Sequence, residues 1–192
     1  MNETSSLIDL PIDLIEMIAL QSYPVFLILK DYSLYLREML INEWYQQKLI
    51  NTFWLKLEEN KENDKRILYY NRNTHLLDSP LRDLKGIISI PAVLNERPVF
   101  KTKIWYKNGK IHRNEYGYEG YKLPAKIISS GWRMCDLINF EEEWWNDGLL
   151  HRDETDKNGE MLPAIKKYKE KIVTYEWWEN GIIKNKKINL YN

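Results

Sequence analysis

The sequence is poor in the residues that mark several classes of protein. Its 192 residues include one cysteine, which excludes an intramolecular disulfide and a metal site built from several thiolates. No apolar run approaches the roughly 18 residues of a membrane-spanning helix, and the acidic N-terminus lacks the basic start of a secretory signal. We therefore expect a protein that is not secreted, does not enter a membrane and works in a reducing compartment.

An excess of charge of one sign is also missing. The 28 Lys and Arg residues equal the 28 Asp and Glu residues, whereas a dedicated nucleic-acid binder usually carries a basic excess. The balance is a cancellation, because residues 1–65 hold 6 basic and 11 acidic residues while residues 66–192 hold 22 and 17. The change of sign falls in the polar segment 57–66, so we expect a helical domain at 1–65 and a second domain at 66–192.

The first domain has the periodicity of helices. Apolar residues recur at three- and four-residue spacings from Leu10 onward, which predicts a short amphipathic helix. Pro11 suits its first turn and Asp9 is a candidate N-cap. A second apolar stretch follows, and a third helix is expected to begin after the candidate cap Ser33 and to run to Trp54.

The second domain contains an internal repeat. The block Trp105–Arg113 returns as Trp144–Arg152 and, in part, from Trp177 onward. Each block reads aromatic, aromatic, any residue, Asn or Asp, Gly, any residue, aliphatic. A Leu-Pro-Ala segment follows both complete blocks, with its proline 12 residues after the histidine each time. A degenerate first copy begins at Ile67 and carries His75, so the expected units lie near 67–92, 104–127, 143–166 and 176–190.

Each unit is expected to contain a β-hairpin. Asn-Gly and Asp-Gly are the preferred pairs of a two-residue type I′ turn, which needs positive φ at both positions. Hairpins are marginally stable alone, so neighbouring units must pair edge to edge. The sequence therefore predicts an α+β protein, with three helices followed by an antiparallel β-meander. The turn residues are Asn108 and Gly109, Asp147 and Gly148, and Asn180 and Gly181.

The paired aromatic residues of the units are candidate interface residues. Adjacent side chains of a strand point to opposite faces, so one member of each pair faces the core and the other faces outward. The outward members either form an exposed protein-binding ladder or are covered by another layer. The pairs are Trp105 with Tyr106, Trp144 with Trp145, and Trp177 with Trp178.

No set of residues predicts an enzyme, a cofactor or a metal site. The histidines His112 and His151 recur at a fixed place after the hairpin, which indicates a structural role such as contact with the aromatic pair or with a neighbouring carbonyl. Cys135 is expected to be a small buried residue. The run Glu141–Glu143 is expected to be solvated. Lysines near the C-terminus, beside tryptophans, keep single-stranded nucleic acid as a minor alternative.

Two resemblances bear on function. The segment from Leu10 through Tyr23-Pro24 to Leu36 resembles an F-box, and the hairpin units are similar to MORN-like repeats in proteins of giant DNA viruses such as the Marseillevirus group. The order of the two implies an adaptor in the host cytoplasm, whose helices bind a Skp1-type subunit and whose repeats recruit a target for ubiquitination. The partner-binding residues that this resemblance implies are Leu10, Pro11, Leu14, Ile15, Ile18, Phe26 and Leu29.

An alternative function belongs to a different class. Repeated aromatic hairpins and opposite charges on the two halves would also suit a structural or assembly component of a large DNA virus particle, such as a minor capsid or scaffold protein. Its partners would then be other proteins of the virion.

Overall fold

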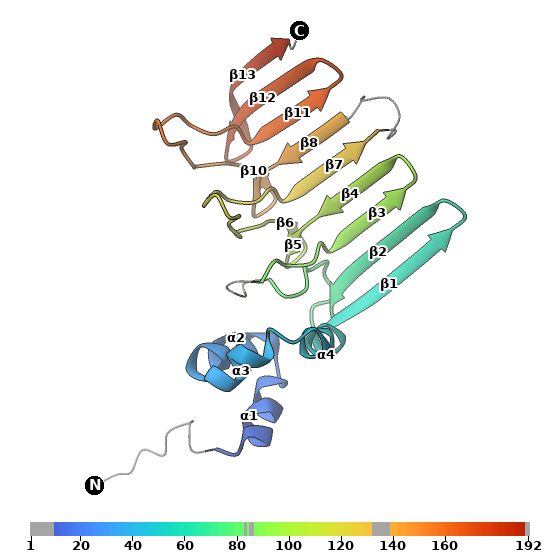
Figure 1. The fold of residues 1–192 in the computed structure, drawn as a ribbon, viewed down its shortest axis with the longest axis vertical. Helices are drawn as coiled ribbons and strands as arrows, with labels where there is room; N and C mark the ends of the chain where they lie inside the picture. The colour runs from blue at the N-terminus through green and yellow to red at the C-terminus, as the bar shows by residue number, and fades with distance from the viewer. Residues whose placement is uncertain (1–9, 83, 85–86, 132–138, 191–192) are drawn as a thin grey trace.

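The computed structural model describes residues 10–82, 84, 87–131 and 139–190. The helices gather at the N-terminal end, and the strands follow as a ladder that runs away from them (Figure 1). The α+β class and the antiparallel meander are therefore confirmed. The described residues form four helices, which are α1 (Ile12–Ala19), α2 (Tyr23–Tyr32), α3 (Leu34–Met39) and α4 (Glu43–Phe53).

The expectation of three helices is wrong, because the third one is interrupted. Ser33 does cap a helix, since its Oγ accepts the Leu36 N–H at 3.3 Å, but that helix ends at Met39. A new helix then starts at Glu43, and the Oδ1 of its N-cap Asn42 accepts the Trp44 N–H at 2.9 Å. A side chain that satisfies a free amide in this way competes with continuation of the preceding helix.

The N-cap of the first helix lies two residues after the expected cap Asp9, and Pro11 stands before the helix and not in its first turn. Pro11 occupies the N-cap position of α1 and its carbonyl accepts the amides of Leu14 and Ile15. Asp9, the expected cap, lies outside the described residues.

A compact apolar core holds the helices together and attaches them to the sheet. Tyr23 of α2 packs edge-on against Trp54, with ring centroids 4.7 Å apart, and Trp54 is the first residue of the sheet. Ring pairs of this geometry contribute roughly 0.5–1.5 kcal/mol beyond the area they bury. The buried members of the core are Ile15, Ala19, Tyr23, Phe26, Leu29, Leu36, Leu40, Tyr45, Leu49, Ile50, Phe53, Trp54, Leu81 and Leu84.

The helical part ends earlier than the charge division suggested. Helix α4 stops at Phe53, and the polar segment expected to be a boundary forms the hairpin of β1 (Trp54–Lys61) and β2 (Asp64–Asn71). The expected boundary after residue 65 therefore falls inside a hairpin. From Leu55 to Lys61 every residue of β1 is exposed. Because sequence-based prediction of a strand depends on alternating buried and exposed residues, an exposed strand of this kind is hard to predict.

The main sheet has nine antiparallel strands among the described residues, in the order β1-β2-β3-β4-β7-β8-β11-β12-β13. Within that part of the chain no helix lies over either face of the sheet (Figure 1). Strands β1 and β13 are its two edges. The remaining strands of this sheet are β3 (Val93–Arg97), β4 (Phe100–Ile104), β7 (Lys126–Ser130), β8 (Asn139–Glu143), β11 (Ile165–Lys169), β12 (Ile172–Glu179) and β13 (Ile182–Leu190).

The Asn-Gly and Asp-Gly hairpins of the second and third units leave the main sheet at one end of its strands. They form two-residue ladders, β5 (Tyr106–Lys107) with β6 (Lys110–Ile111) and β9 (Trp145–Asn146) with β10 (Leu149–Leu150). In the fourth unit the hairpin is continuous with the main strands β12 and β13. The small hairpins and the loops beside them form a row along one side of the ladder (Figure 1).

The turn glycines Gly109 and Gly148 lie 39 residues apart and Gly148 and Gly181 lie 33 apart, a spacing that predicts an insertion at residues 128–142. The structure makes this insertion shorter. Most of that range belongs to β7 and β8, which pair in regular register from Lys126 to Ser130. The extra residues therefore lie in the connection between Ser130 and Asn139, and Cys135 falls in its undescribed part.

Candidate functional site

The turns of the repeat adopt the expected conformation. Both turn residues have positive φ in each unit: 49° and 79° at Asn108 and Gly109, with similar values in the two later turns. The expected pairing of aromatic with aliphatic residues across the hairpin is also present, with Tyr106 opposite Ile111 and Trp145 opposite Leu150. The type I′ hairpins are thus confirmed.

Each turn docks on the preceding unit through two backbone amides. The glycine amide donates to an aliphatic carbonyl, as in Gly148 N–H to Ile111 O at 2.9 Å. The residue before the glycine donates to a side chain: Asp147 N–H to His112 Nδ1 at 3.1 Å, and Asn180 N–H to His151 Nδ1 at 3.2 Å. The repeated histidines therefore act as acceptors that join one unit to the next.

The first unit uses an aspartate for the same purpose. Asp78 is fully buried, and its Oδ1 accepts the Asn108 N–H at 3.0 Å. Because Asp78 follows Leu77, whose carbonyl accepts Gly109 N–H at 2.8 Å, it occupies the place of His112. His75, expected to be the histidine of this copy, is exposed instead.

Asp78 also ties the repeat to the helical end. Its Oδ2 accepts the Trp54 indole N–H at 3.1 Å, and its Oδ1 accepts Arg82 Nε at 2.8 Å. A buried carboxylate with three donors is well satisfied. The Asp78 carboxylate therefore holds the first hairpin, the helical core and the second unit in fixed positions relative to one another.

The first aromatic residue of each pair also crosses a unit junction. Its indole N–H donates to a carbonyl of the preceding unit: Trp105 to Ser89 at 3.0 Å, Trp144 to Lys122 at 2.8 Å and Trp177 to Met161 at 2.7 Å. Trp105 and Trp144 are buried, whereas Trp177 and the second members Tyr106, Trp145 and Trp178 are half-buried. The second aromatic residue of each pair is therefore partly accessible, so these residues are neither a fully exposed ladder nor covered by another layer.

Two arginines that the sequence reasoning did not single out complete the junctions. Arg113 lies 3.8 Å from the centre of the Trp105 ring, and Arg152 lies 4.0 Å from that of Trp144. Burial lowers the pKa of both guanidinium groups and the neighbouring glutamate opposes that shift. The sequence does contain a sign of these arginine contacts, because a glutamate stands two residues after the arginine of each His-Arg pair.

Each arginine has a paired glutamate and a carbonyl acceptor. Arg152 Nε lies 3.0 Å from Glu154 Oε2, and an Arg152 Nη donates to the Pro163 carbonyl at 3.2 Å. The other oxygen of Glu154 accepts the Lys122 N–H of the preceding unit at 2.7 Å. The Arg113 site repeats the same three contacts.

The acidic run Glu141–Glu143 is not a solvated surface. It forms β8 in the middle of the sheet, where Glu143 is buried and pairs with Lys126 at 2.8 Å. Glu141 pairs with Lys167 at 2.8 Å. Burial raises the pKa of both Glu142 and Glu143. Such cross-strand pairs stabilise neighbouring strands of the sheet.

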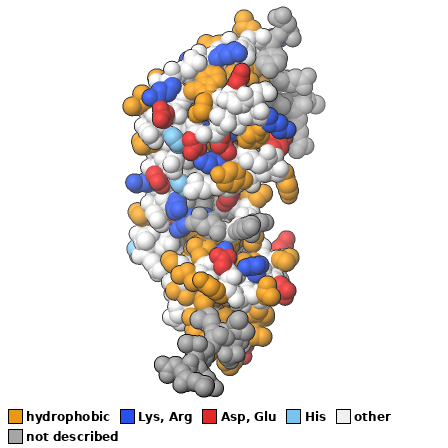
Figure 2. Space-filling view, turned by 90° about the vertical axis from the view of Figure 1, so that its left-hand side faces the viewer, with side chains coloured by type: hydrophobic (Ala, Val, Ile, Leu, Met, Phe, Trp, Pro, Cys, Tyr) orange, Lys and Arg blue, Asp and Glu red, His pale blue; other side chains and the backbone are white. Residues whose placement is uncertain are grey.

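The helical end carries a second candidate site, made of large apolar side chains that stay exposed. Ile28 and Tyr32 lie four residues apart on one face of α2 and are 58% and 73% exposed. Hydrophobic side chains gather over this end of the molecule in Figure 2. The exposed members are Ile12, Met17, Ile28, Tyr32, Leu34, Ile41 and Trp44, which we call the helical apolar surface.

None of the residues that the F-box resemblance implied belongs to the helical apolar surface, and several of them lie in or against the core. Pro11 is exposed, and Leu10, Leu14 and Ile18 are half-buried. The remaining three, Ile15, Phe26 and Leu29, are buried members of the core and so support the helices from within.

The sequence matches no protein-family model, no curated protein and no solved structure. Among the described residues no group of His, Cys, Asp and Glu side chains could hold a metal ion. The part of the chain that the structure describes also contains no helix long and apolar enough to cross a membrane.

Proposed function

We propose that the protein is a non-catalytic adaptor with two binding ends. Its helical end binds a Skp1-type subunit of a ubiquitin ligase, and its repeat sheet binds a target protein. The observation that carries the proposal is the helical apolar surface, because large exposed apolar patches mark protein-interaction sites. The F-box resemblance of the segment around Leu10-Pro11 supplies the kind of partner.

The junction at Asp78 supports an adaptor that holds its two ends in a fixed relation. Trp54 belongs to the helical core, and Asn108 belongs to the turn of the second unit, yet both donate to this one carboxylate. A target on the sheet would thereby be held at a set distance from the subunit bound at the helices.

The proposal is tested by calorimetric titration of the full chain with a purified Skp1-type protein. Ile28→Asp places a charge on the helical apolar surface without touching the core, and should weaken binding at least about tenfold, as loss of a central interface residue does. Ile188→Asp is the matched control, because Ile188 is 59% exposed on the distant strand β13. Leu10→Ala combined with Pro11→Ala tests the F-box motif itself.

Two results would contradict the proposal. The first is that the unmodified protein does not bind. The second is that Ile28→Asp and Ile188→Asp weaken binding equally, since the helical apolar surface would then have no special part.

A further inference from the structure

The fourth unit departs from the others at the position of the stacking arginine. The arginines of the second and third units come eight residues after the first tryptophan, at Arg113 and Arg152. In the fourth unit that position, eight residues after Trp177, is Asn185, which lies directly opposite Trp177 across the β12–β13 ladder. Within the described chain no cation lies over the Trp177 ring.

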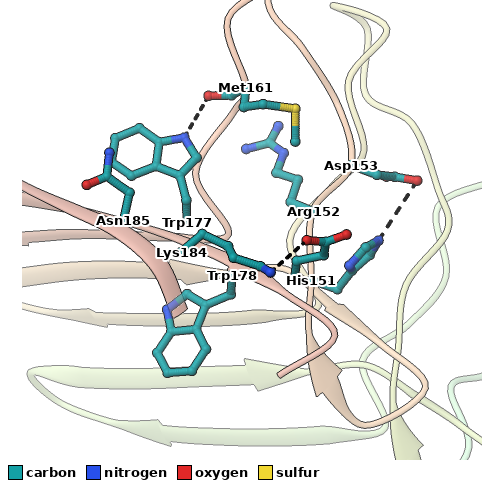
Figure 3. Close-up of a pocket in the computed structure, with 9 residues that line it drawn as sticks. His151, Arg152, Asp153, Met161, Trp177, Trp178, Lys184 and Asn185 are labelled. Atoms are coloured by element: carbon teal, nitrogen blue, oxygen red, sulfur yellow. Dashed lines mark hydrogen bonds and ion pairs between the residues drawn. The ribbon is translucent and has the colours of Figure 1, made fainter. Parts of the chain in front are cut away.

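A hollow lies beside Trp177. It has a volume of about 490 Å³ and lies between the third and fourth units, with Trp177, Trp178 and Asn185 on one side and His151 and Arg152 on the other (Figure 3). The Trp177 indole is held in place by its N–H bond to the Met161 carbonyl at 2.7 Å. The ring is therefore positioned as its counterparts are, but without the guanidinium that covers them.

The charges around the hollow suit a cation. Two exposed carboxylates lie on its wall, Asp153, which pairs with Lys122 at 2.7 Å, and Glu179, which pairs with Lys184. The cations of the wall are already neutralised: Arg152 by Glu154 at 3.0 Å, and Lys184 by Glu179 at 3.1 Å. An anionic ligand would have to break these pairs, whereas a cation can share the carboxylates.

We propose that this hollow, which we call the Trp177 site, binds an arginine side chain presented by another protein. The guanidinium stacks on the Trp177 ring as Arg113 and Arg152 stack within the chain, and it shares the carboxylate of Glu179 with Lys184. Strand β13 is an edge of the sheet, so an extended segment can lie beside it and carry the arginine over Asn185. The site would serve as the target-binding end of the proposed adaptor.

The Trp177 site can be tested by NMR titration of the full chain in the absence of a Skp1-type protein. Failure of this test is then distinct from failure of the proposed Skp1 binding. The probe is N-acetyl-arginine amide, and the signal is the indole N–H resonance of Trp177, assigned from a Trp177→Phe variant. We expect the arginine probe to shift this resonance in a saturable way. N-acetyl-lysine amide should bind about two- to fivefold more weakly and N-acetyl-citrulline amide should not saturate, because stacking of a planar cation supplies the selectivity.

The sharpest variant is Asn185→Arg, which restores the internal arginine. It should move the Trp177 resonance in the direction that the probe does and abolish further binding. Ile188→Arg is the matched control, because it adds the same charge to β13 away from the ring and should leave binding unchanged. Equal shifts with all three probes, or full binding by Asn185→Arg with an intact spectrum, would overturn the proposal.

Discussion

Removal of Arg152 tests how the units are held together. Its side chain is 7% exposed, and that of its partner Glu154 is 13% exposed. In Arg152→Met the carboxylate of Glu154 loses its counter-charge, the Pro163 carbonyl loses a donor and the Trp144 ring loses its cation. Breaking a buried pair by removing one partner costs about 3–5 kcal/mol. At about 2–4 °C per kcal/mol for a chain of this size, we expect Tm to fall by about 6–20 °C.

The double variant Arg152→Met with Glu154→Gln separates charge from packing. It removes the uncompensated carboxylate, so we expect it to be more stable than Arg152→Met alone by about 1–3 kcal/mol. Arg97→Met is the control, because the pair of Arg97 with Asp64 is exposed and should contribute about 1 kcal/mol or less. Denaturant unfolding followed by circular dichroism measures all three. A double variant that is less stable than Arg152→Met would refute the reasoning.

Three further predictions concern other parts of the molecule. His151→Ala removes the acceptor of the exposed Asn180 amide and should lower the free energy of unfolding by about 0.5–1.5 kcal/mol in denaturant titration; His151→Asp should lose less, because Asp78 performs the same role in the first unit. Burial raises the pKa of Glu142, so its ionisation costs stability as pH rises above the unfolded value of about 4.3. Glu142→Gln should therefore raise Tm at pH 7, and the gain should vanish in thermal scans near pH 4. Trp54→Phe leaves an oxygen of buried Asp78 without its indole donor and should lower stability by about 1–3 kcal/mol, while a gain or no change would contradict the junction.

The hairpins were predictable from sequence because their chemistry is local. A type I′ turn needs positive φ at two successive residues, and Asn-Gly or Asp-Gly meets that need without reference to the rest of the fold. The fixed spacing of the histidines likewise showed a repeated structural role. Their exact partner, the turn amide of the next unit, was not predictable because it joins His112 to a residue 35 positions away.

The antiparallel meander was predictable, but the extent of some of its strands was not, because they do not carry an apolar alternation. Strand β8 reads Asn-Phe-Glu-Glu-Glu and satisfies its charges with lysines of the neighbouring strands. Strand β1 is exposed from Leu55 to Lys61. The main sheet is stabilised in part by cross-strand pairs, whose register only the folded chain defines. The break between α3 and α4 was missed because Leu40 continues the helical spacing, while the Asn42 cap depends on one side-chain contact.

The proposed function depends most on the helical end, and hydrogen–deuterium exchange tests it directly. The full chain would be compared alone and with a Skp1-type protein in excess. The proposal predicts slower exchange of amides in α1, α2 and α3, with the strands from β3 to β13 unchanged. No change in exchange, or protection confined to the sheet, would contradict it.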